Sequence, residues 1–251
     1  MKFYYQLLSK QHRLIYHTLK SAIENYTSEC TFYDLSLTAE QIGDIITSIL
    51  MDYPDYYWTK GNFSTYTDSF SVPPCLRVRI HYLFDNKQCQ KLDIQIQNSI
   101  NNCLNYIGQT PNPSKVIFSL CKWIYQNITY AFSPDTDQTI YSVFHQKKSV
   151  FMGISRAAAL ILRLYDIDSI VTLGKFLGKY PHSWLIVHLN GSYFHLDITL
   201  GYPCFDTLWN ASHPSVGHAA ERYCILRNDS WLSATHTLSN KYPYPSCRRL
   251  F

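Results

Sequence analysis

The sequence predicts an α+β fold, and three kinds of pattern support that prediction. Apolar residues recur every three or four positions in residues 9–26 and 87–107, which is the spacing of a helix with one buried face. Residues 76–84 alternate between apolar and polar side chains, as a half-buried strand does. The pair Asn190-Gly191 separates two further strand-like segments. With 46% hydrophobic residues among 251, the chain can bury one sizeable core, or a core with a smaller lobe.

The N-terminal half is predicted to contain three helices and one strand. The helix over 9–26 has an apolar face made of Leu14, Ile15, Leu19, Ala22 and Ile23. A second helix begins at Thr38, because Thr38 and Gln41 have the spacing of a capping box. The strand over 76–84 precedes helix 87–107, whose inward side chains are Leu92, Ile96, Ile100, Cys103, Leu104 and Ile107. We expect these apolar stripes to form core rather than binding surface.

A break at residues 110–114 marks the predicted domain boundary. The segment reads Thr-Pro-Asn-Pro-Ser, and its two prolines interrupt helical structure. A further helix follows, with an apolar face of Val116, Ile117, Leu120, Ile124 and Tyr125. The sequence therefore predicts an N-terminal α+β lobe over residues 1–110 and a C-terminal core over residues 111–251. The break is too short to be a flexible linker.

Composition and charge argue against several classes of protein. The net charge is +4, and the basic residues are scattered rather than interleaved with aromatic residues, which argues against a nucleic-acid partner. No stretch reaches the roughly 18 apolar residues that span a bilayer, and the N-terminus lacks the features of a secretory leader, so we expect a cytoplasmic protein without a membrane partner. None of the eight cysteines forms a C-x-x-C pair, so we expect reduced thiols without a zinc ribbon or redox site.

A buried helix is predicted to begin near Phe151. Residues 149–155 read Ser-Val-Phe-Met-Gly-Ile-Ser, and residues 156–162 are small or apolar except for one arginine. The start of a helix offers free backbone N–H groups and the positive end of the helix dipole. A thiol at that position would have a lowered pKa and would be a better nucleophile. The residue there is a phenylalanine.

A hairpin is predicted to bring a histidine and an aspartate together. A two-residue Asn-Gly turn pairs Leu189 with Ser192. Alternation along both strands then places the side chains of 182, 184, 195, 197 and 199 on one face. His182 and Asp197 become diagonal neighbours with Cα atoms about 7–8 Å apart, within reach of a hydrogen bond between their side chains.

These segments resemble motifs of the transglutaminase-like branch of the papain-like thiol enzymes, in its bacterial, clostridial-type form. The family pattern is a G-V-C-x-G-[YI]-[SA] helix start, an H-[AS]-W strand and an L-D-x-T strand. Here these read S-V-F-M-G-I-S, H-S-W and L-D-I-T, at residues 149–155, 182–184 and 196–199. Weaker similarity in further segments extends the resemblance over nearly the whole chain, at residues 51–58, 124–130, 235–236 and 244–247.

The resemblance implies a papain-like core, in which a central helix packs on an antiparallel sheet, and a Cys-His-Asp triad. His182 and Asp197 match the histidine and aspartate of that triad, and Phe151 stands at the position of the nucleophilic cysteine. Trp184 would form a wall of the substrate-binding groove. The family pattern brings no cofactor, and we expect no metal.

The departures from the pattern bear on chemistry. The benzyl group of Phe151 cannot ionise, attack a carbonyl or hold an acyl intermediate. Leu185 and Leu200 replace an asparagine and a tryptophan that are usual in the family, and Cys121 lies where an acidic or histidine-containing stretch is usual. We therefore predict a catalytically inactive protein, or pseudoenzyme, that keeps a His-Asp pair and a groove for a peptide or protein segment.

Three other hypotheses stay open. An amidase, peptidase or transamidase could use a relocated nucleophile, either Ser155 on the buried helix or Cys204 in a later turn. A purely structural or regulatory module would instead use Phe151 to fill a closed site. His188 and His195 share the predicted face of the triad residues and could bind a metal with them, but no further ligand is evident. The sequence predicts no oligomeric state.

Overall fold

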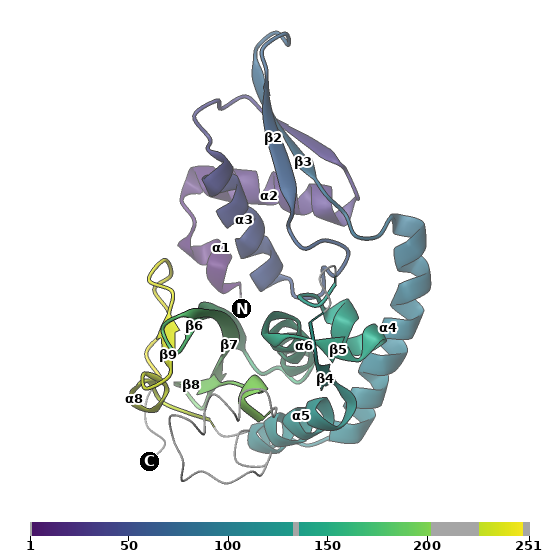
Figure 1. Cartoon of the computed structure of the whole chain (residues 1–251), viewed down its shortest axis with the longest axis vertical. Coiled ribbons are helices and arrows are strands. Elements are labelled where there is room, and N and C mark those ends of the chain that lie inside the picture. Colours follow the sequence, from purple (N-terminus) through teal and green to yellow (C-terminus); the bar gives the residue numbers. More distant parts are fainter. Residues whose placement is uncertain (1, 133–135, 202–225, 248–251) are drawn as a thin grey trace. The chain divides into compact units, whose positions relative to one another are not determined.

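A computed structural model describes residues 2–132, 136–201 and 226–247 (Figure 1). The chain divides into two compact units, Lys2–Asp93 and the remainder from Ile94 onward, so the division falls within helix α4 (Asn86–Ile107). The sequence analysis placed its domain boundary later, at the proline-containing break after residue 110. The helix over 87–107 is confirmed as one continuous element.

The first unit combines three helices with a three-stranded antiparallel sheet. Its helices are α1 (Phe3–Leu7), α2 (Lys10–Glu24) and α3 (Ala39–Asp52), and its strands are β1 (Glu29–Phe32), β2 (Phe63–Asp68) and β3 (Cys75–Ile80), in the order β1-β3-β2. The predicted capping box is present: the Thr38 hydroxyl accepts from the Gln41 backbone, and the Gln41 side chain accepts from the Thr38 backbone. The strand expected over 76–84 is confirmed but ends at Ile80.

The second unit holds a four-stranded antiparallel sheet in the order β8-β7-β6-β9. These strands are β6 (Ser169–Phe176), β7 (Tyr180–Leu189), β8 (Ser192–Leu196) and β9 (His236–Leu238). Its helices are α5 (Pro113–Asn127), a π-helical turn η1 (Ser142–Gln146), α6 (Phe151–Leu164), a 3₁₀ turn η2 (Thr199–Gly201) and α8 (Asp229–Leu232). Two short strands, β4 (Thr129–Tyr130) and β5 (Lys148–Ser149), pair in parallel just before α6.

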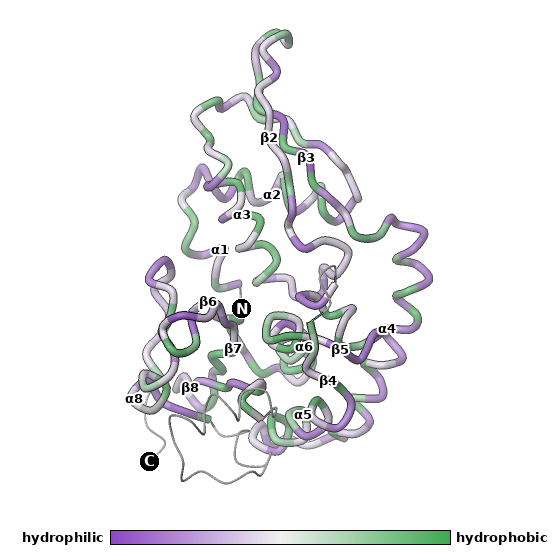
Figure 2. Tube along the Cα trace, in the orientation of Figure 1, coloured by the Kyte–Doolittle hydropathy of each residue, from purple (hydrophilic) through white to green (hydrophobic). Residues whose placement is uncertain are grey.

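Helix α6 packs on strands β6 and β7 and forms the centre of this unit. Nine of the residues of α6 between Gly153 and Leu162 are buried, and Figure 2 shows the helix as mostly hydrophobic. Strand β7 is buried along most of its length, because the helix covers it and strands flank it on both sides. A central helix on an antiparallel sheet confirms the predicted α+β architecture.

The β7–β8 hairpin has the predicted register. Leu189 pairs with Ser192 and His188 pairs with Tyr193. Asn190 and Gly191 both have positive φ, at 49° and 77°, which is what a type I′ turn requires and what the Asn-Gly sequence favours. The turn chemistry therefore fixes which side chains of β7 meet those of β8.

Two further expectations concern helices and thiols. Among the described residues, none of the helices combines the length and apolar character needed to cross a bilayer. The six cysteines within the described ranges are all buried, and the expectation of reduced thiols stays a prediction.

Candidate functional site

Two buried histidines and a buried aspartate from one sheet come together at a single carboxylate oxygen. His182 lies in β7, Asp197 follows β8, and His236 is the first residue of β9. The Oδ2 atom of Asp197 lies 2.7 Å from Nε2 of His182 and 2.9 Å from Nε2 of His236. The predicted His182–Asp197 contact is thus confirmed, and a second histidine shares its acceptor.

The carboxylate of Asp197 is fully saturated with hydrogen bonds. Its other oxygen, Oδ1, accepts from the Thr199 backbone N–H at 2.9 Å and from the Thr199 hydroxyl at 2.7 Å. Burial acts to raise the pKa of Asp197, but His182 and His236 outweigh burial and hold the pKa well below its ordinary value. The group is therefore an ionised acceptor, and each histidine must carry its proton on Nε2 to donate to it.

Aromatic rings enclose His182. The centre of its ring lies 5.2 Å from that of Phe151, 5.7 Å from that of Phe176 and 5.9 Å from that of Trp184. Its side chain is 1% exposed, and that of Asp197 is 2% exposed. The site is therefore closed against water by apolar side chains, with Phe151 contributing the face that comes from the start of α6.

A second hydrogen-bond network begins at the indole nitrogen of Trp184. The indole Nε1 donates to Nδ1 of His195 at 3.0 Å, and Nε2 of His195 lies 2.8 Å from Oδ1 of Asp229. The other oxygen of Asp229 accepts from the Cys247 backbone at 2.9 Å. Because an indole N–H can only donate, Nδ1 of His195 must be the acceptor and Nε2 must carry the proton. Burial lowers the pKa of His195, although Asp229 opposes that shift.

Trp184 is a buried wall between these two networks. Its ring centre is 4.9 Å from that of His236, and the residue is fully buried. The sequence analysis assigned Trp184 to a substrate-binding groove, but contact with a bound chain would require its neighbours to move. Gly174 makes room for the indole, since a Cβ there would lie 2.6 Å from the Trp184 ring and 2.4 Å from the Thr237 carbonyl oxygen.

The start of α6 is held by a close backbone approach at Gly153. A Cβ on Gly153 would lie 2.2 Å from the Ser149 hydroxyl and 2.5 Å from the carbonyl oxygen of Asp137. That hydroxyl donates to the same carbonyl and shares a 2.7 Å hydrogen bond with Ser142. These contacts position Phe151, the first residue of the helix, beside the ring of His182.

The proposed relocated nucleophiles do not gain support from this geometry. The hydroxyl of Ser155 donates to the backbone carbonyl of Ser183 at 3.1 Å, so its proton is directed at a peptide group rather than at a base. Cys204 lies outside the described residues. His188 stacks on Tyr193 at the far end of β7, and His195 pairs with Asp229. Neither His188 nor His195 is grouped with His182 and Asp197 as a shared metal site would require.

His236 is the site residue that sequence reasoning missed. It appeared only as part of the Thr235-His236 segment that resembles the family. Strand β9 is three residues long and pairs with β6 across about 60 intervening residues, so no local periodicity indicates where it packs. The local signal in the sequence was the adjacent pair Thr235-His236. In the structure these two residues interact, with Nδ1 of His236 lying 2.8 Å from the Thr235 hydroxyl.

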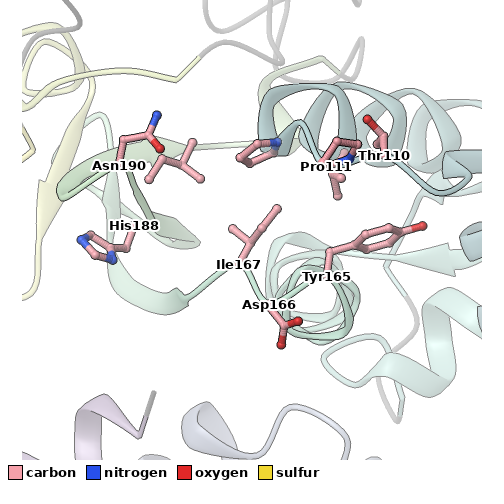
Figure 3. A pocket seen from close by; sticks show the side chains of 10 residues that line it. Thr110, Pro111, Tyr165, Asp166, Ile167, His188 and Asn190 are labelled. Carbon is pink, nitrogen blue, oxygen red and sulfur yellow. The ribbon is translucent and has the colours of Figure 1, made fainter.

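A separate pocket of about 270 Å³ lies beyond the hairpin end of β7 (Figure 3). Its walls combine apolar and polar side chains and come from the start of α5, the α6–β6 connection and the β7–β8 turn. The side chains of Tyr165 and Ile167 face those of Pro111 and Thr110, while Asp166, His188 and Asn190 supply polar groups. The pocket therefore offers both apolar contacts and hydrogen-bonding groups to a ligand.

Comparisons with known proteins assign no family. No family model and no curated protein matches the chain. Among solved structures, a TGase is 12% identical over 55% of this chain and 44% of its own, with a TM-score of 0.38. A candidate cysteine protease from Cytophaga hutchinsonii is 14% identical over 55% and 62%, with a TM-score of 0.36. A candidate protease from Parabacteroides distasonis is 12% identical over 56% and 36%, with a TM-score of 0.34.

These solved structures are thus transglutaminase-like and protease-like proteins, of which the chain spans about one third to two thirds. Similarity at this level carries no argument about family, activity or substrate. The α+β architecture, the enclosed His-Asp-His cluster and the position of Phe151 stand on the geometry of the chain itself.

Proposed function

We propose that the protein is a catalytically silent transglutaminase-like protein in which the His182–Asp197 pair has become part of the core. The observation that carries the proposal is Phe151, whose ring lies at the first turn of α6 and 5.2 Å from the ring of His182. A thiol enzyme would need its sulfur at that place, close to the imidazole that accepts its proton. A benzyl group supplies no nucleophile.

The burial of the cluster supports a structural role for it. The Asp197 carboxylate has four hydrogen-bond donors, and aromatic side chains cover the imidazole of His182. A working acyl-transfer site must admit a carbonyl group next to the nucleophile and the histidine. In this protein that space holds Phe151, which favours the closed module over an open catalytic groove.

Amide hydrolysis and transamidation assays test the proposal. We expect no turnover of peptide or glutamine amides by the wild-type protein, with or without a primary amine acceptor. Phe151→Cys is expected to gain measurable acyl transfer that His182→Ala removes, because only that variant places a thiol beside the imidazole. Wild-type turnover that is lost in His182→Ala would contradict the proposal, and Ser155→Ala would then show whether the buried serine is responsible.

A peptide- or protein-binding role is a second candidate, and the pocket around Tyr165 favours it more than the surroundings of His182 do. The Tyr165 hydroxyl donates to the carbonyl groups of Leu104 and Gly108, so the ring is fixed in place as a rigid apolar wall. A screen of short peptides that carry both apolar and polar side chains, by ligand-observed NMR, tests this role. We expect binding that weakens in His188→Ala, a change at the rim of the pocket, and no binding at all would remove the candidate.

A further inference from the structure

We propose that His182, Asp197 and His236 form a binding site for a divalent transition-metal ion of the Zn²⁺ class. Two imidazole nitrogens and a carboxylate oxygen are a donor set that zinc uses in proteins. Their ligand atoms all lie within 4.8 Å of one another, and all three residues are buried. The inference does not depend on whether the protein is catalytically silent, because it uses none of the chemistry of position 151.

The distances allow an ion to enter with small movements. Both Nε2 atoms contact the same carboxylate oxygen, at 2.7 Å and 2.9 Å. Tetrahedral coordination at bond lengths of about 2.0–2.1 Å places neighbouring ligand atoms roughly 3.3 Å apart. Each histidine nitrogen therefore needs to move only about half an ångström away from Oδ2 of Asp197. Because they come from β7, the end of β8 and β9 of one sheet, the backbone already holds them in convergent positions.

The protonation pattern of His236 is compatible with coordination. To bind a metal through Nε2, a neutral imidazole must carry its proton on Nδ1. Without a metal, Nε2 of His236 donates to Asp197, and the Thr235 hydroxyl, 2.8 Å from Nδ1, donates to that second nitrogen. When a metal takes the place of the Nε2 proton, the hydroxyl can direct its own proton to the Leu232 carbonyl oxygen, 3.5 Å away. The hydroxyl oxygen can thus accept the Nδ1 proton. Such an outer partner fixes the ring orientation of a metal-binding histidine.

Asp197 is also oriented for coordination. Thr199 holds Oδ1 through both its backbone N–H and its hydroxyl, which leaves Oδ2 directed at the two histidines. The surrounding rings of Phe151, Phe176 and Trp184 exclude water and strengthen charge interactions with a bound cation. Three protein ligands leave a fourth coordination position, which a single water molecule enclosed with the ion and cut off from bulk solvent would occupy.

A second group of potential ligands, His195, Asp229 and Cys247, provides a contrast. The indole N–H of Trp184 donates to Nδ1 of His195, so Nε2 of His195 carries the proton and has no lone pair for a metal. Binding there would leave the buried indole donor facing an N–H group. An indole N–H can only donate, so His195 is fixed with its proton on Nε2, whereas the Thr235 hydroxyl can accept as well as donate and so allows His236 to move its proton to Nδ1. This ability to change tautomer favours the site that contains His236, and the His195 group serves as the matched control.

Metal titration of the full-length chain tests the proposal. After treatment with a chelator and its removal, the protein is titrated with Zn²⁺ and with Co²⁺, and bound metal is measured by elemental analysis. We expect one ion per chain. The Co²⁺ form should show visible absorption of a tetrahedral site without a thiolate charge-transfer band. Removal of either histidine ligand, by His182→Ala or His236→Ala, should weaken binding at least 10-fold, whereas the double variant His195→Ala/Cys247→Ser should bind as the wild type does.

A milder variant keeps the test decisive if the ligand variants fail to fold. Thr235→Val removes the outer partner of His236 and is nearly isosteric, and loss of such a partner typically lowers metal affinity about 10–100-fold. Absence of stoichiometric binding by the wild type would overturn the proposal. So would a thiolate band, or binding that survives in folded His236→Ala protein. The acyl-transfer assay with Phe151→Cys is performed with chelator present. Failure of the proposed function and failure of the metal-site proposal therefore appear in different experiments.

Discussion

At the scale of single residues, hydrogen-bond donors and acceptors determine the protonation of the site. Asp197 receives four hydrogen bonds, which requires an ionised carboxylate and Nε2–H tautomers of His182 and His236. The donor-only indole of Trp184 likewise sets the tautomer of His195. Sequence alone predicted the His182–Asp197 contact, because turn type and strand parity suffice for it. It did not predict His236, since that contact depends on a long-range strand pairing.

Asp197→Asn is expected to destabilise the fold by about 1–3 kcal/mol or more at pH 7, because an amide in place of the carboxylate leaves buried donors without their charged acceptor. The folded-state pKa of Asp197 is lowered, so its contribution is fully present above the ordinary pKa of about 3.9. As pH falls below about 4, the unfolded chain gains a proton that the folded state does not, and the contribution shrinks. Urea unfolding of both proteins between pH 7 and pH 3 should therefore show a narrowing gap; a constant gap would contradict the assignment.

His195 makes a second pH-dependent contribution to stability, because its pKa is lowered by burial. Below the ordinary histidine pKa of about 6.5, the unfolded chain binds a proton that buried, neutral His195 does not, so the wild type loses stability as the solution is acidified. His195→Gln removes this term. We expect the wild type to lose more stability than the variant between pH 7 and pH 5, and equal losses would show that His195 is charged in the folded state.

At the scale of elements, the packing of α6 and the sheet requires glycine at two positions, and sequence periodicity did not predict this requirement. Gly174 lies in β6 against Trp184, and Gly153 lies at the start of α6 against Ser149. The helix itself was predictable from its apolar composition, and the β7–β8 hairpin from Asn190-Gly191. Strands β6 and β9 were not, because a strand with a mixed burial pattern carries little local signal and its pairing is decided by distant partners.

Gly174→Ala is expected to destabilise the protein by about 1–3 kcal/mol or more, because overpacking a core usually costs that much. The new methyl group would meet both the Trp184 ring and a backbone carbonyl oxygen, and the backbone atom cannot rotate away. Gly43→Ala in α3 is the matched control, because a Cβ there lies an ordinary 3.4 Å from Phe63 and alanine favours helix. Thermal unfolding should show a lower midpoint for the first variant and an equal or higher midpoint for the second.

At the scale of the whole molecule, the enclosed cluster and the pocket belong to the unit that begins at Ile94. In the enclosed site His182 and His236 meet the carboxylate of Asp197, and the ring of Phe151 lies beside His182 at the start of α6. The pocket lies at the opposite end of β7, where His188 rather than His182 faces it. The proposed function accounts for both features, with a silent core at one end of β7 and a separate ligand pocket at the other.

Tryptophan fluorescence and far-UV circular dichroism of Phe151→Ala address whether the phenylalanine acts as a core residue. Truncation of a partly buried phenylalanine beside His182 is expected to cost stability, up to about 3 kcal/mol, while the fold persists. Met152→Ala, one position further along α6 and similarly half-buried, is the comparison. A Phe151→Ala variant as stable as the wild type would show that the ring does not fill the site.

The reactivity of a thiol introduced at position 151 tests the central claim most directly. Alkylation of Phe151→Cys and of Met152→Cys by a mild thiol reagent at about pH 6 is followed by mass spectrometry, in the presence of chelator. An ordinary thiol, with a pKa near 8.5, reacts slowly at that pH, whereas one beside His182 at the start of α6 should react at least 10-fold faster. The account predicts fast labelling at position 151 alone, lost in Phe151→Cys/His182→Ala. Equal, slow labelling at both positions would mean that no triad scaffold remains and would contradict the account.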